Sequence, residues 1–179
     1  MPDKKNLALY DMNQSNDKII FSETQRFRQW WLLLMVSAPV IYSVYSLLDK
    51  FVFSATEKDT TSIYGLLIGF IVNDLLLVMF LLVKLETTIE KETIAVRFFP
   101  FHLKSKAYRK DEISKLEIRK YKPIREYGGW GIRGSRDNRA LNVLGTMGLQ
   151  IEFTDGKRLL IGTQKPDELE AAIQSWKKS

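Results

Sequence analysis

The 179-residue chain has no cysteine and a single histidine, His102. The lack of cysteine excludes disulfides and thiol chemistry, and one histidine cannot form the paired ligands of a typical zinc site. The chain also lacks the phosphate-cradling loop GxxxxGK followed by Ser or Thr. We therefore predict that the protein is not an enzyme, and we expect no catalytic residue, no cofactor and no metal ligand. His102, which follows the run FFPF, is interpreted as a structural residue.

Formal charge is almost absent from two long segments. Trp30–Leu48 carries none over nineteen residues, and Ile63–Val83 carries only Asp74 over twenty-one. At a rise of about 1.5 Å per residue, each helix would span roughly 30 Å, the thickness of a bilayer's hydrocarbon core. We predict two transmembrane helices. The alternative is a soluble helical hairpin with a buried core, which no other segment is apolar enough to cover.

The charges that flank these segments predict their orientation. Arg26 and Arg28 precede the first segment and Lys84 follows the second, whereas residues 49–62 carry more acidic than basic side chains. The positive-inside rule then places both termini in the cytoplasm. We also expect a helix to start within Phe21–Arg28, where Ser22 or Thr24 could cap it. Three regions are predicted: an N-terminal cytoplasmic or interfacial segment (1–29), a transmembrane hairpin (30–84) and a cytoplasmic domain (85–179).

From Leu85 onward the sequence changes to short runs rich in Thr, Ile, Val, Phe and Tyr, separated by turn signals. This texture is typical of consecutive antiparallel strands, and Asp155-Gly156 suits a tight hairpin turn. The strands are predicted at 86–89, 93–99, 104–109, 115–121, 125–132, 140–144, 148–153 and 158–162.

The chain is predicted to end in an amphipathic helix from Pro166 to about Lys178. Its apolar residues recur at helical spacing and need a sheet to cover; they are Leu169, Ala172, Ile173 and Trp176. About seven strands closed by one C-terminal helix is the plan of a pleckstrin-homology-like (PH-like) barrel. The predicted fold class is thus an α+β membrane protein, a two-helix hairpin followed by a PH-like antiparallel barrel. A plain α+β sandwich is the alternative for the second part.

Three stretches resemble a family of small bacterial membrane proteins of no established activity, in which two transmembrane helices precede a bacterial PH-like domain. They are RFFPF (Arg97–Phe101), RKYKPIREYGGWGIR (Arg119–Arg133) and LQIEFTDGKRLLIGTQKPDEL (Leu149–Leu169). The likeness covers almost the whole chain. It implies the same topology and fold, and a multi-pass protein of the bacterial plasma membrane. It carries over no catalytic residue.

Positive charge is concentrated between Arg97 and Arg139, where thirteen Lys or Arg face five Asp or Glu, a net charge of +8 against +6 for the whole chain. Within this part, REYGGWGIRGSRDNR combines arginines with glycines that expose the backbone. We interpret it as an edge that meets a lipid headgroup, a peptide or the protein's own helical hairpin. The other interpretation is a structural bulge with Trp130 in the core. The predicted binding residues are Arg125, Tyr127, Gly128, Gly129, Trp130, Arg133, Arg136 and Arg139.

The function predicted from these features is a membrane-anchored binding or scaffold module. Because the first predicted strand begins directly after Lys84, the basic domain would lie near an anionic leaflet, where each Lys or Arg contributes about 1 kcal/mol. Expected partners are the membrane, anionic headgroups, and a protein or a second copy, but not nucleic acid. The alternative function is an oligomeric channel or transporter subunit built around the intramembrane polar pair Asn73 and Asp74, which could instead be polar contacts that pack the helices.

Overall fold

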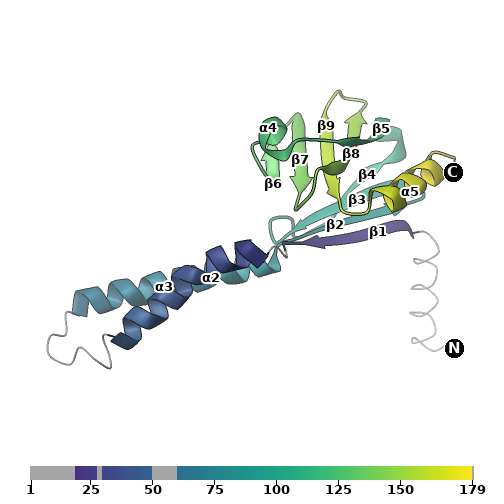
Figure 1. Ribbon diagram of the computed structural model, residues 1–179. Helices are drawn as coiled ribbons and strands as arrows, with labels where there is room; N and C mark the ends of the chain where they lie inside the picture. Colours follow the sequence, from purple (N-terminus) through teal and green to yellow (C-terminus); the bar gives the residue numbers. More distant parts are fainter. Residues whose placement is uncertain (1–18, 28–29, 50–59, 179) are drawn as a thin grey trace, which may run out of the picture. The chain divides into compact units, whose positions relative to one another are not determined.

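The computed structural model describes residues 19–27, 30–49 and 60–178, which form two units (Figure 1). Among these residues, 19–26 and 84–178 make a unit of two β-sheets, and 27–83 make a helical unit. The predicted N-terminal segment lies outside the described residues over 1–18, as does the predicted connector over 50–59.

The first sheet of the two-sheet unit has four antiparallel strands in the order β1-β2-β3-β4. Every second residue of β2 and β3 is buried, as expected for strands that turn one face to a core. The buried positions include Leu85, Ile89, Ile94 and Val96. The strands are β1 (Ile19–Arg26), β2 (Lys84–Glu90), β3 (Thr93–Phe99) and β4 (Lys106–Arg109).

The second sheet has five strands in the order β5-β8-β9-β7-β6, and its β7–β9 pair is parallel. A 3₁₀ turn at Lys110–Glu112 leads from the first sheet into the second, and the short helix α4 (Pro123–Tyr127) leads from β5 to β6. Leu149, Ile151 and Leu160 are fully buried in this sheet. Its strands are β5 (Ile113–Lys120), β6 (Gly131–Gly134), β7 (Asn138–Asn142), β8 (Met147–Phe153) and β9 (Arg158–Thr163).

The helix α5 (Pro166–Lys178) closes the two-sheet unit and confirms the predicted C-terminal helix. All four residues of the predicted apolar stripe are buried. Two side chains near its C-terminal end bond to strands of different sheets: Trp176 Nε1 donates to the Glu90 carbonyl oxygen at 2.8 Å, and Lys177 Nζ donates to that of Leu116 at 3.2 Å. The helix therefore links the two sheets.

Strand β1 corrects the expectation of a helix within Phe21–Arg28. Its alternating pattern buries Phe21, Glu23 and Gln25 on one face. A strand satisfies this pattern because its side chains alternate between faces, whereas a helix would spread the three residues around its surface. β1 pairs with β2 in antiparallel register, with Arg26 opposite Lys84. Residues 27–83 are therefore an insertion between two neighbouring strands.

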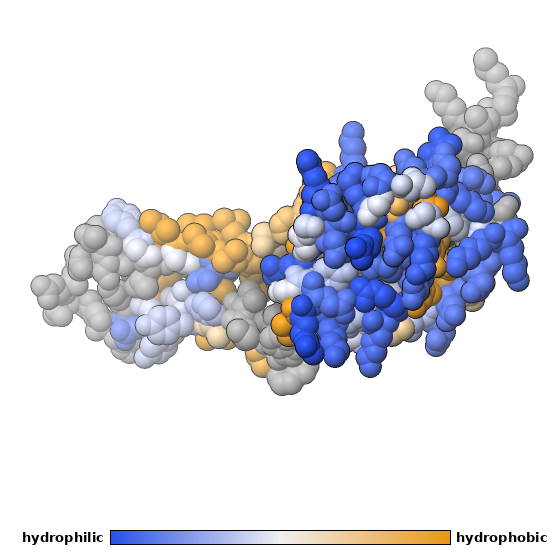
Figure 2. All heavy atoms as spheres, turned by 90° about the horizontal axis from the view of Figure 1, so that it is seen from above, coloured by the Kyte–Doolittle hydropathy of each residue, from blue (hydrophilic) through white to orange (hydrophobic). Residues whose placement is uncertain are grey.

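The helical unit consists of α2 (Trp30–Leu48) and α3 (Thr60–Leu82), which pack against each other. Within this unit, the rings of Phe27 and Phe80 lie 5.1 Å apart. Large apolar side chains are exposed along both helices, among them Ile41 and Leu75. Figure 2 shows such residues in orange over the helices, and mainly hydrophilic residues on the visible face of the two-sheet unit.

The prediction of transmembrane spans at 30–48 and 63–83 is wrong, because no helix in the described part of the chain is both long enough and apolar enough to cross a membrane. The prediction rested on the length of the two segments and on their scarcity of formal charge, which measures apolarity incompletely. Pro39 and Ser43 interrupt the apolar residues of α2, and Asn73 and Asp74 interrupt those of α3. The predicted membrane fold class and the multi-pass location with cytoplasmic termini depended on these spans and are therefore also wrong.

The sheets differ from the predicted single antiparallel barrel of about seven strands. The described residues form an α+β fold with two sheets, of four and five strands, and one parallel pair. The strand predicted at Arg125–Ile132 is also wrong. Pro123 at the start of α4 and Gly128 at its end, with φ of 77°, are the residues that begin and terminate a helix. Only Gly131–Gly134 of this region is a strand.

Candidate functional site

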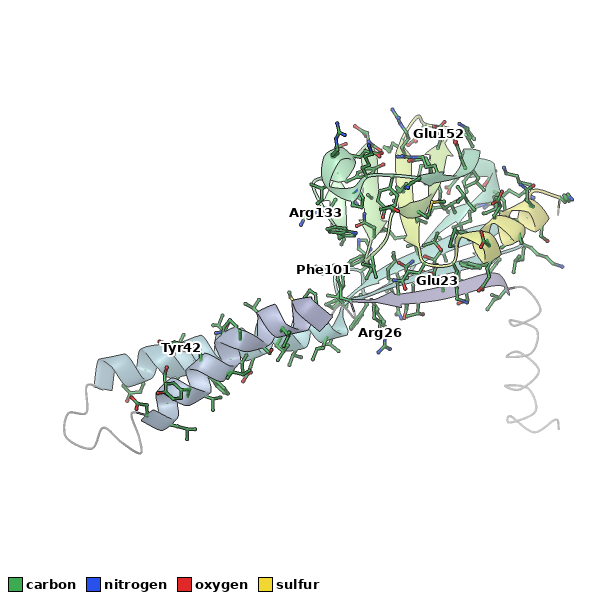
Figure 3. All side chains as sticks on the ribbon, viewed as in Figure 1. Glu23, Arg26, Tyr42, Phe101, Arg133 and Glu152 are labelled. Carbon is green, nitrogen blue, oxygen red and sulfur yellow. The ribbon has the colours of Figure 1, made fainter. Side chains whose placement is uncertain are left out.

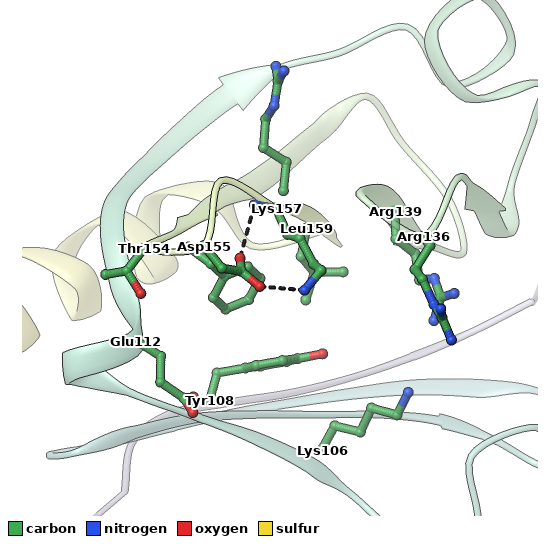
Figure 4. Close-up of a pocket in the computed structure, with 11 residues that line it drawn as sticks. Lys106, Tyr108, Glu112, Arg136, Arg139, Thr154, Asp155, Lys157 and Leu159 are labelled. Atoms are coloured by element: carbon green, nitrogen blue, oxygen red, sulfur yellow. Dashed lines mark hydrogen bonds and ion pairs between the residues drawn. The ribbon is translucent and has the colours of Figure 1, made fainter.

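A cleft of about 640 Å³ opens on the two-sheet unit and is lined from both sheets (Figure 4). β4 contributes Lys106 and Tyr108, and the turn between β6 and β7, with the start of β7, contributes Arg136 and Arg139. The rest comes from Glu112 and the β8–β9 hairpin, which supplies Phe153, Thr154, Asp155, Lys157, Arg158 and Leu159.

Positive charge dominates this cleft. Five of the lining residues are Lys or Arg and two are Asp or Glu. Asp155 is already engaged, since its carboxylate forms an ion pair with the Lys157 ammonium and accepts the Lys157 amide at 3.0 Å. Within the described residues, four cations of the cleft form no ion pair. They are Lys106, Arg136, Arg139 and Arg158, called the four cleft cations below.

The β6–β7 turn carries Arg136 and leads into β7, which carries Arg139. Gly134 has φ of 84°, and a Cβ atom there would lie 2.1 Å from the Asn138 carbonyl oxygen, so the turn requires glycine. The turn closes through the Ser135 amide, which donates to the Asn138 carbonyl oxygen at 3.0 Å. The Arg158 amide donates to the Asp137 carbonyl oxygen at 2.8 Å. Because β7 runs parallel to β9, this bond brings Arg158 beside the turn.

An aromatic pair completes the cleft. The Tyr108 and Phe153 rings lie 5.0 Å apart at 45°. Burial raises the pKa of the Tyr108 hydroxyl, Arg139 opposes that rise, and Glu112 adds to it. The hydroxyl therefore stays protonated near neutral pH and can donate a hydrogen bond. In Figure 4 it points toward Arg136 and Arg139.

The single histidine of the chain, His102, does not line the cleft, but two of the cleft cations affect its charge state. Burial lowers the pKa of His102, and the positive charges of Lys106 and Arg139 lower it further. Its Nδ1 atom is buried and has no hydrogen-bond partner among the described residues. His102 is therefore neutral near pH 7, and its pKa depends on the charge of two of the four cleft cations.

The predicted binding stretch divides between two places. Arg136 and Arg139 line the cleft, whereas Arg125 and Tyr127 belong to α4. Tyr127 is buried, and its hydroxyl accepts a hydrogen bond from Arg119 Nη2 at 3.3 Å. The residues between these parts are the cap Gly128, the buried Gly129, the half-buried Trp130, and Arg133, whose Nε donates to the Trp130 carbonyl oxygen at 2.9 Å.

The predicted polar pair lies elsewhere. Asn73 and Asp74 are in α3 and are both half-buried. The channel or transporter alternative required them to lie within a membrane span. No helix among the described residues provides such a span.

Several cleft residues were not predicted. The predicted basic region includes Lys106, but the sequence gives no indication of a role for Tyr108, Phe153 or Arg158. Their common location depends on two contacts that link distant segments, the parallel β7–β9 pair and the Tyr108–Phe153 contact. The sequence signals for this surface are the +8 charge of residues 97–139 and the arginines of REYGGWGIRGSRDNR, of which Arg136 and Arg139 line the cleft.

A sequence model of the family of unknown function DUF6141 matches residues 12–179, nearly the whole chain. Neither the curated proteins nor the solved structures give a match.

Proposed function

The chain belongs to DUF6141, a family of unknown function, and we propose that its two-sheet unit is a non-enzymatic binding module whose cleft receives a phosphate-bearing ligand. The observation that carries the proposal is the convergence of the four cleft cations without ion pairs on one concave surface. Like charges held close together repel one another, and a bound anion relieves that repulsion.

Phosphate suits these cations better than a single carboxylate does. Three of the four are arginines, whose planar guanidinium groups offer paired N–H donors that match phosphate oxygens. Lys106 adds a flexible ammonium from β4, and Tyr108 adds a protonated hydroxyl. A phosphate group offers enough oxygens to accept from several of these donors, while a carboxylate has only two.

Isothermal titration calorimetry of the full-length protein with inorganic pyrophosphate tests this proposal. The double variant Arg136→Glu/Arg139→Glu removes two cleft donors. If each charge-assisted hydrogen bond contributes about 1.5 kcal/mol, affinity falls by roughly a hundredfold.

A matched control separates the cleft from general charge. Arg125→Glu/Arg133→Glu changes the net charge by the same amount but alters no cleft-lining residue. We expect its affinity to stay within about threefold of the wild type, because exposed charges outside a site are largely screened by salt. Equal losses in the two double variants, or no heat of binding with the wild type, would contradict the proposal.

A further inference from the structure

The loop between β3 and β4, residues 100–105, exposes two large apolar side chains. Leu103 is 74% exposed and Phe101 is 58% exposed. Of the exposed large apolar residues of the two-sheet unit, Leu103 is the most exposed. Figure 3 shows Phe101 on this loop. Two neighbouring apolar groups left in water are energetically unfavourable, so they indicate a surface that something covers.

The loop is held in shape by the strand that precedes it. The His102 amide donates to the Phe98 carbonyl oxygen at 2.7 Å, and the Phe101 ring lies 6.1 Å from that of Phe98. Phe98 itself is fully buried in the core. The exposed apolar groups are therefore presented by a loop that is attached to the core.

Cations adjoin the apolar residues. Lys104 lies within the loop and Lys106 directly after it, and both are exposed. Lys106 also lines the cleft. The charges of Lys106 and Arg139 lower the pKa of His102, which lies in the loop. Lys106, which directly follows the loop and also lines the cleft, therefore places the apolar loop next to the cleft.

We propose that the loop at residues 100–105 is a docking tip for an anionic lipid surface, with Phe101 and Leu103 entering the boundary between headgroups and acyl chains. Lys104, Lys106 and the cleft arginines then contact the lipid phosphates. An apolar tip bordered by cations complements an anionic lipid surface, which is apolar beneath a layer of negative charge. This peripheral contact needs no spanning helix. The lipid inference rests on the proposed function, because it identifies the phosphate bound by the cleft as that of a lipid headgroup.

The experiment places a reporter on the tip. Since the chain has no cysteine, Leu103→Cys provides the only thiol for an environment-sensitive dye in the full-length protein. With vesicles of phosphatidylcholine containing about 30% phosphatidylserine, we expect a blue shift of the dye and roughly threefold less quenching by iodide, as apolar burial at the interface requires. Vesicles of phosphatidylcholine alone should change neither signal.

Ile124→Cys is the matched control. Ile124 is 67% exposed on α4 and has cationic neighbours in Lys122 and Arg125, but it does not line the cleft. Its dye should remain open to iodide with both kinds of vesicle. Equal protection at both positions would overturn the proposal, as would full quenching of the dye at position 103 with anionic vesicles. A blue shift that grows with protein concentration without vesicles would also overturn it, and would show a second copy covering the tip.

The pyrophosphate titration separates this inference from the proposed function. If pyrophosphate binds in the cleft but the dye at position 103 stays in water, the cleft takes a soluble phosphate ligand and only the lipid inference fails. If the dye enters the lipid but pyrophosphate does not bind, the cleft proposal fails, and with it the assignment of the phosphate to a lipid.

Discussion

Removal of the Glu23 carboxylate is expected to destabilise the two-sheet unit more than any surface substitution. Glu23 is only 6% exposed, and its carboxylate accepts two hydrogen bonds from residues 140 and 141 positions later in the chain. The donors are Thr163 Oγ at 2.7 Å and the Gln164 amide at 2.8 Å. Together with the bond from Gln25 Nε2 to the Gly162 carbonyl oxygen, they join β1 to the end of β9.

The magnitude follows from these contacts. A hydrogen bond to a charged group contributes about 1.5–3 kcal/mol, and buried donors left unpaired keep their desolvation cost. Glu23→Ala should therefore lower the free energy of unfolding by about 4 kcal/mol. The midpoint of urea unfolding should then fall by roughly 2 M. Glu23→Gln should lower the free energy of unfolding by about half as much, since the amide oxygen can still accept one hydrogen bond while the amide NH₂ group faces the second donor.

Urea denaturation followed by tryptophan fluorescence measures this loss. Trp30 and Trp31 belong to α2, so Trp30→Phe/Trp31→Phe in every protein leaves Trp130 and Trp176 to report on the two-sheet unit. Glu170→Ala, at an exposed position of α5, should change the free energy by less than about 0.5 kcal/mol. A loss below about 1 kcal/mol for Glu23→Ala would refute the reasoning, because it would mean that these bonds do not hold β1 in place.

Two other substitutions test the turn at the cleft and the charge pairing of the first sheet. Gly134→Ala should cost about 3 kcal/mol in the same assay and weaken pyrophosphate binding, because its φ of 84° and the close Asn138 carbonyl oxygen leave no room for Cβ. An unchanged urea midpoint would contradict the conclusion that this turn requires glycine at position 134. The Glu86 pKa is held below its ordinary value of 4.5 chiefly by the hydrogen bond from Arg97 Nε at 2.5 Å, against an opposing effect of burial. A lowered carboxyl pKa stabilises the fold above pH 4.5 and loses that contribution as the pH falls further, so the stability difference between the wild type and Arg97→Gln should shrink below pH 4.5. A difference that stays constant between pH 7 and pH 3 would contradict the pairing.

Elements with local signals could be predicted from the sequence. The last hairpin follows from two short runs rich in apolar residues on either side of Asp155-Gly156, and α5 follows from its periodic apolar residues and its Pro166 start. Strand β1 could not be predicted from alternation of apolar and polar residues, because two of its buried residues, Glu23 and Gln25, are polar. Their burial depends on hydrogen bonds that form only in the folded chain.

The misplaced elements have physical causes as well. In the Arg125–Ile132 region, the aromatic and apolar residues suggested a strand, but the Pro123 start and the Gly128 cap gave a helix. The helices predicted at 30–48 and 63–83 are present at 30–48 and 60–82, but the expectation that they cross a membrane, drawn from their length and scarcity of charge, is wrong.

The candidate site could be predicted only as a region. Local charge identified the basic segment, and Arg136 and Arg139 from it do reach the cleft. The choice between these two and Arg125 or Arg133 depends on the direction of the β6–β7 turn and on the parallel pairing of β7 with β9. Such pairing between distant segments has no local sequence signal.

The most direct test of the cleft proposal is an NMR titration of His102, whose ring gives the only histidine signal in the protein. In the free protein its pKa should lie below the ordinary value of 6.5, because the ring is partly buried and faces Lys106 and Arg139. Saturating pyrophosphate should raise that pKa, since an anion between these cations offsets their charge. The same pKa with and without pyrophosphate would show that no anion binds beside Lys106 and Arg139, and would contradict the account.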